Sequence, residues 1–262
     1  MGILNLTPDS FSDGGKFTRP DQALAQTECM LREGASIIDI GGYSTRPYAP
    51  EITPEEELRR VEKITGLILE KFPEAILSID SFRTEVVRPL LDMGVHIVND
   101  IFADQASGEM MRTVARYKNV PYIMMHMQGT PQTMQQAPQY KSVTTEVLQF
   151  FVEQIYEARQ KGIEDIVIDP GFGFGKTLLN NYQLLEGLHH FNLLNRPVLV
   201  GISRKSMIYK FFETDPGDVL EITTALHLKA LEKGALILRV HDVKAAARIV
   251  QLYGYLKENG II

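Results

Sequence analysis

The chain has 262 residues, of which 44% are hydrophobic and 23% charged, and its formal net charge is -6. This composition is that of an ordinary globular protein, and the length fits one domain, residues 1–262, of the size of an α/β barrel. The negative net charge argues against a protein that coats nucleic acid or an anionic membrane. An anionic substrate would therefore need a few well-placed Lys and Arg side chains.

The single cysteine, Cys29, excludes an internal disulfide framework and fits a reducing compartment. The N-terminal residues show no basic region and no long apolar run, so we expect neither a signal peptide nor a membrane span. The expected location is therefore the cytoplasm.

Short apolar segments alternate with amphipathic segments along the chain. The apolar ones have the length of buried strands, and helix signals occur between them, such as Thr53-Pro54 before a helix that should run to about Lys71. The acidic run Glu55–Glu57 at the start of that helix is expected to be solvated. The strands are predicted over residues 2–6, 36–40, 75–81, 96–100, 121–126, 166–169, 197–201 and 235–240.

Eight strand–helix units average about 33 residues each, which is the size of a βα repeat and predicts a closed (β/α)8 TIM barrel of the α/β class. A doubly wound open sheet is the alternative. In a barrel the carboxyl ends of all strands open on the same side, so that residues far apart in the sequence converge there.

The sixth predicted strand ends in Asp169 and is followed by a glycine-rich loop. Gly171, Gly173 and Gly175 allow backbone conformations that other residues rarely adopt, which indicates that something approaches this backbone closely. The loop is neither a P-loop nor a dinucleotide fingerprint, because Pro170 and Lys176 occupy positions where those motifs require glycine.

Polar side chains follow nearly every predicted strand. Any one of them could be a helix cap or a turn residue, and His126 could equally be a core or loop residue, but caps alone do not explain the mixture of carboxylates, amides and cations. The set consists of Asn5, Asp39, Asp80, Asn99, His126, Asp169, Lys205, Arg239 and His241, with Arg46 and Lys176 on loops.

The chemistry of this set falls into two groups. Asp80, Asn99 and Asp169 offer carboxylate and amide groups to a flat heterocycle that bears N–H donors and a carbonyl, such as an aminopyrimidinone, and Lys205 adds donors to it. The second group contains Arg46, Asn5, Arg239 and His241. It suits a phosphate or diphosphate, and Asn5 offers an oxygen ligand to Mg2+, which usually keeps several waters and bridges substrate phosphates.

The chain resembles the dihydropteroate synthases, and the resemblance extends in order over essentially its whole length. It rests on Met1–Gly15 (MGILNLTPDSFSDGG), Gly41–Pro47 (GGYSTRP), Asp169–Lys176 (DPGFGFGK), Ser203–Ser206 (SRKS) and Arg239–Asp242 (RVHD). Tyr43 and Tyr48 depart from the family pattern, which concerns the shape of the second loop.

The resemblance implies a transferase of folate biosynthesis that joins 6-hydroxymethyl-7,8-dihydropterin diphosphate to 4-aminobenzoate and releases diphosphate with Mg2+. It also implies a homodimer. The family that it resembles is a target of sulfonamides. The implied pterin and diphosphate contacts are Thr45, Asp80, Asn99, Asp169, Lys205, Arg239 and His241, with Asn5 on the metal. The implied aminobenzoate contacts are Phe11, Pro47 and Ser206 beside Lys205, and Asp13 and Arg46 lie on the two loops that close over the site.

We expect a dissociative substitution in which Arg239, His241 and Mg2+ stabilise the departing diphosphate, and the amine then attacks the pterin methylene carbon. The pterin contacts alone would also fit a corrinoid-dependent methyltransferase that uses methyltetrahydrofolate. A Schiff-base lyase that uses Lys205 and a non-catalytic barrel that binds a folate precursor are further alternatives.

Overall fold

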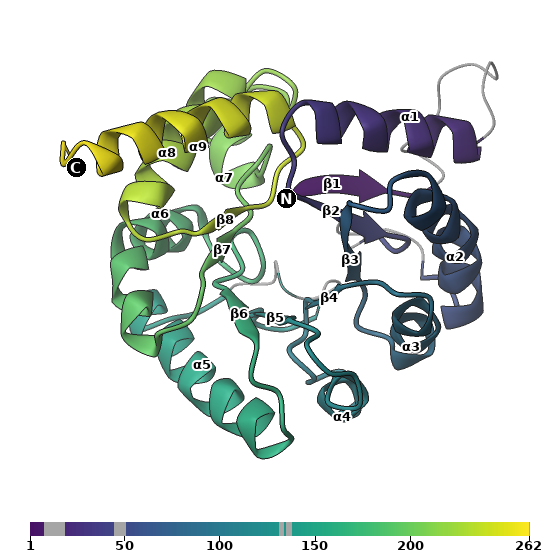
Figure 1. Cartoon of the computed structure of the whole chain (residues 1–262). Helices are drawn as coiled ribbons and strands as arrows, with labels where there is room; N and C mark the ends of the chain where they lie inside the picture. The colour runs from purple at the N-terminus through teal and green to yellow at the C-terminus, as the bar shows by residue number, and fades with distance from the viewer. Residues whose placement is uncertain (8–18, 45–50, 131–133, 135–137, 262) are drawn as a thin grey trace. The chain divides into compact units, whose positions relative to one another are not determined.

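The computed structural model describes residues 1–7, 19–44, 51–130, 134 and 138–261 (Figure 1). The chain divides into two compact units. The first consists of Met1–Met124 and Ala158–Asp165, and the second of Met125–Glu157 and Ile166–Ile262.

The first unit is built on parallel strands that alternate with helices. Neighbouring strands pair in sequence order from β1 to β5. In Figure 1 the helices of this unit cover one face of its strands, as successive βα units require. The strands are β1 (Gly2–Asn5), β2 (Ile37–Gly41), β3 (Ile76–Asp80), β4 (Ile97–Asp100) and β5 (Tyr122–Met125), and the helices are α1 (Arg19–Arg32), α2 (Pro54–Lys71), α3 (Thr84–Asp92) and α4 (Met110–Val114).

Helix α2 shows how the sequence sets these boundaries. The side chain of Thr53 accepts a hydrogen bond from the backbone N–H of Glu56 (3.3 Å), and Pro54 occupies the first helical position, where its missing N–H is not needed. Val61 and Ile68 are fully buried on the inner face of the helix. The predicted start at Thr53-Pro54 and the predicted end near Lys71 are both confirmed.

The prediction that the acidic run in α2 is solvated is wrong for Glu57. Its side chain is fully buried and bonds Arg83, with 2.9 Å between Glu57 Oε2 and Arg83 Nη1. The cause is the period of the helix, because Glu57 lies four residues before Val61 and therefore on the inner face of α2. The charge is accepted there because a guanidinium faces it.

The second unit continues the alternation of strands and helices. β7 and β8 pair in parallel, and Ile168 at β6 forms a parallel bridge with Val198 just before β7. Its elements are α5 (Val143–Gln160), which ends in the first unit, β6 (Ile166–Asp169), α6 (Leu178–Glu186), the 3-10 helix η2 (Gly187–Leu194), β7 (Leu199–Val200), α7 (Ser206–Tyr209), α8 (Leu220–Glu232), β8 (Ile237–Leu238) and α9 (Val243–Glu258).

The predicted order of strands is confirmed, and the largest differences are in the last two strands. β7 and β8 contain two residues each, whereas the sequence predicted residues 197–201 and 235–240. Backbone bonds nevertheless continue beyond them, since Leu236 N donates to Val198 O (2.9 Å) before both strands and Arg239 N donates to Val200 O (3.0 Å) after β8. Among the residues that the structure describes, no helix has the length and apolar character needed to cross a membrane.

Candidate active site

Four neighbouring strands of the first unit place site residues at one level. The register puts Asn5 beside Gly41, Gly41 beside Asp80, and Asp80 beside Asn99. Residues in register on parallel strands point to the same face, so the three polar side chains share a face of the sheet. A Cβ atom at Gly41 would lie 3.5 Å from Asn5 Oδ1 and 3.7 Å from Asp80 Oδ2. The glycine thus leaves space between an amide oxygen and a carboxylate.

Asp39 holds the amide of Asn99. It lies two residues before Gly41 on β2 and is fully buried, and Asn99 Nδ2 donates to Asp39 Oδ2 over 3.0 Å. A buried carboxylate that accepts from the amide fixes which way the Asn99 side chain is turned. The structure thus places Asp39 where it orients Asn99, which the sequence did not distinguish from a direct ligand contact.

The loop after Asp80 is anchored by a cluster that sequence reasoning missed. Arg83 bonds the buried Glu57 and lies over the rings of Tyr43 (5.0 Å) and Phe82 (5.1 Å). Burial raises the pKa of the Glu57 carboxyl, and the positive charge of Arg83 opposes that rise. The one signal in the sequence was the spacing of Glu57, which lies four residues before Val61 and therefore on the inner face of its helix.

Asp100, at the end of β4, shapes a turn. Its carboxylate accepts hydrogen bonds from the N–H of Phe102 (2.9 Å), the N–H of Asp104 (2.8 Å) and the hydroxyl of Tyr122 (2.6 Å). Burial raises the pKa of Asp100, and these donors oppose the rise. Asp100 is therefore a turn residue, which is one of the two structural roles that the sequence left open for a polar side chain after a strand.

In the second unit, Asp169 ends β6 as a buried carboxylate. Its Oδ1 accepts a hydrogen bond from Gly171 N (2.8 Å). Burial raises the pKa of Asp169, while the positive charge of Lys205 and the bond from Gly171 act in the opposite direction. A buried carboxylate with nearby cations is suited to accept hydrogen bonds from ligand N–H groups.

Lys205 extends back over the glycine-rich loop. Its ammonium donates to the carbonyl of Phe172 and lies 4.4 Å from the centroid of the Phe174 ring. A Cβ atom at Gly173 would approach Lys205 Cδ to 3.1 Å, so the loop and the lysine stem are in close contact. The loop residues thus determine where the ammonium of Lys205 lies.

Arg239, which directly follows β8, lies near Lys205, which follows β7. A Cβ atom at Gly201 would lie 3.8 Å from Arg239 Cβ and 3.9 Å from Lys205 Nζ, so both side chains pass this glycine. His241 follows two residues later, and its backbone N–H donates to Ser203 Oγ (3.2 Å). Two cationic side chains, Lys205 and Arg239, therefore meet beside Gly201, a pair suited to an anionic group, and His241 follows on the same segment as Arg239.

Lys176 and His126 form a buried pair at the base of the same loop. Lys176 Nζ lies 3.0 Å from His126 Nδ1, and both side chains are more than nine-tenths buried. Burial lowers the pKa of His126 to about 3 and that of Lys176 to about 7. Lys176 ends the loop as predicted, but its ammonium turns into the protein.

Five predicted site residues lie outside the described residues, and a sixth begins a short helix. The five are Phe11, Asp13, Thr45, Arg46 and Pro47. Ser206 is the first residue of α7, which is only four residues long, so the helix dipole at its start is small. Any anion there would depend on individual N–H groups and side chains.

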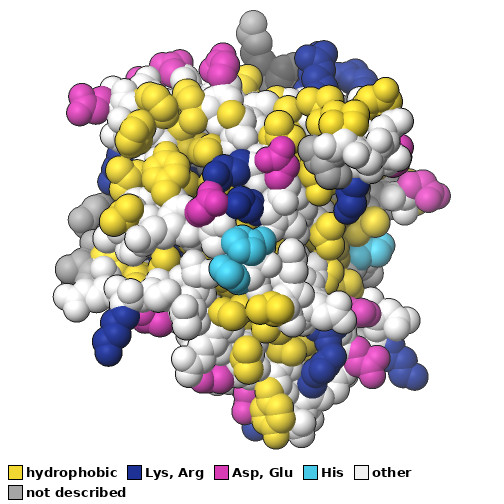
Figure 2. Space-filling view, turned by 90° about the vertical axis from the view of Figure 1, so that its left-hand side faces the viewer, with side chains coloured by type: hydrophobic (Ala, Val, Ile, Leu, Met, Phe, Trp, Pro, Cys, Tyr) yellow, Lys and Arg dark blue, Asp and Glu magenta, His cyan; other side chains and the backbone are white. Residues whose placement is uncertain are grey.

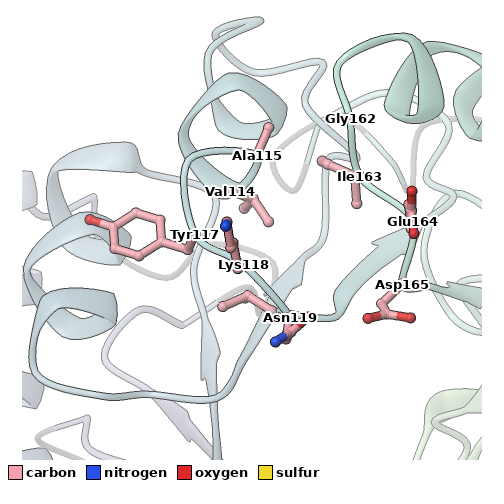
Figure 3. A pocket seen from close by; sticks show the side chains of 10 residues that line it. Val114, Ala115, Tyr117, Lys118, Asn119, Gly162, Ile163, Glu164 and Asp165 are labelled. Atoms are coloured by element: carbon pink, nitrogen blue, oxygen red, sulfur yellow. The ribbon is translucent and has the colours of Figure 1, made fainter.

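The hollow in Figure 3 belongs to the other end of the strands. Its walls come from the C-terminal side of α4 and from the segments that precede β5 and β6, including Tyr117, Lys118, Glu164 and Asp165. Asp80 and Asn99 lie at the opposite, carboxyl ends of their strands. In an α/β barrel the carboxyl end carries the chemistry, and this hollow is therefore not a candidate for it.

The described residues contain no group of three or more His, Cys, Asp and Glu placed to hold a metal ion. The oxygens beside Gly41 are of the hard type that Mg2+ prefers, an amide from Asn5 and a carboxylate from Asp80. The donor set therefore fits a magnesium ion that is held mainly by water and by substrate.

Comparison with known proteins decides the family. Residues 1–241 match the family described as pterin binding enzyme. The dihydropteroate synthase of Escherichia coli K12 is 46% identical over 264 residues, which cover 99% of this chain and 93% of that protein. The chain belongs to the dihydropteroate synthase family. The Haemophilus influenzae dihydropteroate synthase is 44% identical and covers 97% of this chain and 92% of its own length.

Solved structures of the family agree with this assignment. A Yersinia pestis dihydropteroate synthase in complex with a sulfonamide drug has a TM-score of 0.92 and 40% identity, covering 98% of this chain and 94% of that one. A Xanthomonas albilineans dihydropteroate synthase with 4-aminobenzoic acid has a TM-score of 0.91 and 41% identity, covering 98% and 92%. The predicted family, the α/β barrel fold class and the predicted activity, a transferase reaction of folate biosynthesis, are confirmed.

Proposed function

We propose that the residues placed in the two units carry out the dihydropteroate synthase reaction as the sequence predicts. The observation that carries the proposal is the row formed by Asn5, Gly41, Asp80 and Asn99, because it aligns three polar side chains around a position without a side chain. The Xanthomonas albilineans enzyme has also been solved in complex with 7,8-dihydropteroate, at 38% identity and a TM-score of 0.88. That product supports the pterin and aminobenzoate as substrates of this chain.

The pterin ring is proposed to bind Asp80, Asn99, Asp169 and Lys205. An ionised carboxylate accepts two parallel hydrogen bonds from a ring N–H and the neighbouring amino group, which is the edge that an aminopyrimidinone presents. The second unit supports this role for Asp169, since its carboxylate is buried and faces cations. The amide of Asn99, turned by Asp39, adds a donor and an acceptor.

The diphosphate is proposed to bind Thr45, Arg239 and His241, with Asn5 as the protein ligand of Mg2+. When bound, Mg2+ would neutralise charge on the diphosphate oxygens. Arg239 would share that task from the protein side, since a guanidinium forms paired hydrogen bonds with phosphate oxygens. The proximity of Arg239 to Lys205 at Gly201 supports an anionic group beside the pterin.

These assignments favour a dissociative substitution. Arg239 and His241 stabilise negative charge as the carbon–oxygen bond to diphosphate breaks, and Asp80 and Asp169 hold the electron-rich pterin that carries the positive charge. The amine of 4-aminobenzoate, proposed to lie against Phe11, Pro47 and Ser206, then attacks the methylene carbon and loses its proton. Asp13 and Arg46 are proposed to close the two loops and exclude water.

We propose a cytoplasmic homodimer. The exposed large hydrophobic side chains lie mostly in the second unit, for example Leu193, Leu236 and Tyr255, and Figure 2 shows hydrophobic groups gathered among charged ones. Where such groups form a contiguous patch, they are typical of a surface that contacts another subunit. Light scattering of the purified protein would give twice the chain mass.

The assignment of Asp169 can be tested with a variant at each end of β6. Asp169→Asn removes the charge-assisted bonds to the pterin, and the control Asp165→Asn makes the same change at the exposed residue before the strand. We expect pterin affinity to fall by about 100-fold in the first variant, the equivalent of roughly two charged hydrogen bonds, and to stay unchanged in the second. Calorimetry with 6-hydroxymethylpterin and a diphosphate-release assay measure both. Wild-type affinity in Asp169→Asn would remove Asp169 from the site.

A further inference from the structure

Lys176 is a buried cation whose hydrogen bonds all go to the protein. Its ammonium lies 2.9 Å from Gly171 O, 3.0 Å from Phe174 O, 3.3 Å from His126 O and 3.0 Å from His126 Nδ1, and the residue is only 4% exposed. An ammonium has three N–H donors, so four acceptors already exceed its capacity. Lys176 therefore has no donor for a substrate and can act only through the groups that it holds.

Those groups belong to two chain segments that meet at very short range. A Cβ atom at Gly171 would lie 1.8 Å from His126 O, and one at Gly175 would lie 2.4 Å from Gln128 O. The glycine loop is thus packed backbone to backbone against the segment after β5. Buried carbonyls need donors, and here the ammonium of Lys176 supplies them to both segments.

The same loop contacts the two groups of the second unit that are proposed to bind the pterin. Gly171 N donates to the carboxylate of Asp169 over 2.8 Å, next to the carbonyl that accepts from Lys176. The carbonyl of Phe172 accepts from Lys205, and the ring of Phe174 lies 4.4 Å from the ammonium of Lys205. Lys176 holds the residues on both sides of Phe172. A shift of the loop would therefore move both the N–H of Gly171, which donates to Asp169, and the carbonyl of Phe172, which accepts from Lys205.

A second anchor holds the outer side of the loop. Asn181 Oδ1 accepts from Gly173 N (2.7 Å), and Asn181 Nδ2 donates to Thr177 O (2.8 Å). Asn181 is buried on α6, and its hydrogen bonds hold Gly173 and the end of the loop. The carbonyls of Gly171 and Phe174 accept instead from the ammonium of Lys176. The inner carbonyls depend on Lys176.

We propose that Lys176 is a positioning residue for pterin binding, which holds the glycine loop so that Asp169 and Lys205 present their polar groups to one ligand. The inference rests on the proposed pterin contacts of Asp169 and Lys205. It assigns Lys176 no contact with substrate. A lysine that only stabilised the fold would affect unfolding and every ligand alike, whereas a positioning residue affects the pterin and spares the diphosphate.

The test replaces the ammonium with an apolar group of similar length, Lys176→Met. Thermal unfolding measures stability, and calorimetry measures the affinities of 6-hydroxymethylpterin and of inorganic diphosphate with Mg2+. We expect pterin affinity to fall by about 10-fold or more, the effect typical of groups that orient a ligand-binding residue, while diphosphate affinity stays unchanged. Lys161→Met is the matched control, since Lys161 Nζ bonds Asp104 (3.2 Å) in the first unit. It should lower stability only.

Asp169→Asn separates failure of the inference from failure of the proposed site. If Asp169→Asn keeps wild-type pterin affinity, the proposed site is wrong. If it loses affinity while folded Lys176→Met keeps it, only the role of Lys176 is overturned. Lys176→Gln, which retains two N–H donors on a shorter side chain, is the second variant, and we expect its pterin affinity to lie between those of wild type and Lys176→Met. If neither variant folds, Lys176 is structural and the proposal fails.

Discussion

The row of site residues in the first unit and the glycine loop in the second hold ligand groups in different ways. In the first unit, Asn5, Asp80 and Asn99 sit on strands whose register fixes their level. In the second, the carboxylate of Asp169 at the end of β6 accepts from a loop amide, and Lys205 is held by the carbonyl of Phe172 and the ring of Phe174. In a sheet, many backbone hydrogen bonds fix the position of a side chain, whereas in a loop only a few contacts do so.

This difference between sheet and loop predicts how each region responds to a substitution. A change to a residue that supports the row from outside it, such as Glu57, should alter stability more than affinity, because the strands keep their register. A change beneath the loop should alter affinity as well, because the loop is what orients the polar groups.

The largest effect is expected for Gly171→Ala. Gly171 has a φ of +73°, and a Cβ atom there would overlap the carbonyl of His126 at 1.8 Å. The loop must move away from the segment after β5, so we expect unfolding free energy to fall by about 3 kcal/mol or more and activity to be lost. Urea unfolding and the diphosphate-release assay report the two quantities.

Gly108→Ala isolates the strain of the backbone from the overlap. Gly108 has the same φ of +73°, and a Cβ atom there meets nothing within 4 Å among the described residues. Only the left-handed conformation is penalised, at about 1–2 kcal/mol, and activity should persist. Equal losses of stability in the two variants would show that the close approach of loop and segment does not matter.

A smaller effect is expected from pH through Lys176. Its pKa is lowered from 10.5 to about 7 by burial, so the unfolded chain binds more protons than the folded chain between these values, and stability should rise with pH. The gain relative to Lys176→Met is at most about 1.4 kcal/mol per pH unit. His126, with a pKa lowered to about 3, stays neutral over this interval. Asp169 and Lys205 are unchanged between the two proteins, so the comparison isolates Lys176.

Pterin affinity should follow the opposite course if the charged lysine holds the loop. Denaturation of wild type and Lys176→Met between about pH 7 and pH 9 gives the stability difference, and calorimetry over the same interval gives the affinity difference. The stability advantage of the wild type should grow while its affinity advantage shrinks. A parallel rise of both would leave Lys176 with a structural role alone.

The strand-end residues could be predicted because strand ends follow from local pattern. Asp80, Asn99 and Asp169 each close a short apolar run, and parallel βα units bring such ends to one side of a sheet. The family resemblance then supplied the roles. The predicted residues that fall on 8–18 and 45–50 remain predictions, since those segments lie outside the described residues.

The direction of a long side chain could not be predicted in the same way. Lys176 ends a loop and Glu57 begins a helix, and both positions are usually solvated. Whether such a charge turns inward depends on partners distant in sequence, His126 for the lysine and Arg83 for the glutamate. No local pattern specifies those partners, and so the anchors of both regions became visible only in the structure.

A moderate effect is expected for Glu57→Gln, which weakens the anchor of the loop after Asp80. We expect a loss of about 1–2 kcal/mol, below the range for a fully buried pair, because Arg83 keeps some contact with solvent and Gln keeps an acceptor oxygen. Pterin affinity should change little, since β3 pairs with both neighbouring strands and holds Asp80 in place. Thermal unfolding and calorimetry provide the comparison with Lys176→Met. A loss of pterin affinity as large as that of Lys176→Met would mean that the two regions depend equally on their anchors.

The smallest change in stability is expected for Gly41→Ala, in the centre of the row. The added methyl would lie at ordinary contact distance from Asn5 Oδ1 (3.5 Å) and Asp80 Oδ2 (3.7 Å), and its backbone is not left-handed. Unfolding free energy should therefore change by less than about 1 kcal/mol. The methyl nevertheless occupies the space between two oxygens, so Mg2+-dependent binding of diphosphate should weaken.

Gly254→Ala on α9 is the control for Gly41→Ala, since a Cβ atom there meets nothing within 4 Å among the described residues and helical alanine should add about 1 kcal/mol of stability. Its diphosphate affinity should equal that of the wild type. Unchanged diphosphate affinity in Gly41→Ala would place the metal away from Asn5. Weakened affinity with intact stability would show that the row needs the absence of a side chain at Gly41 as much as it needs the polar groups on either side.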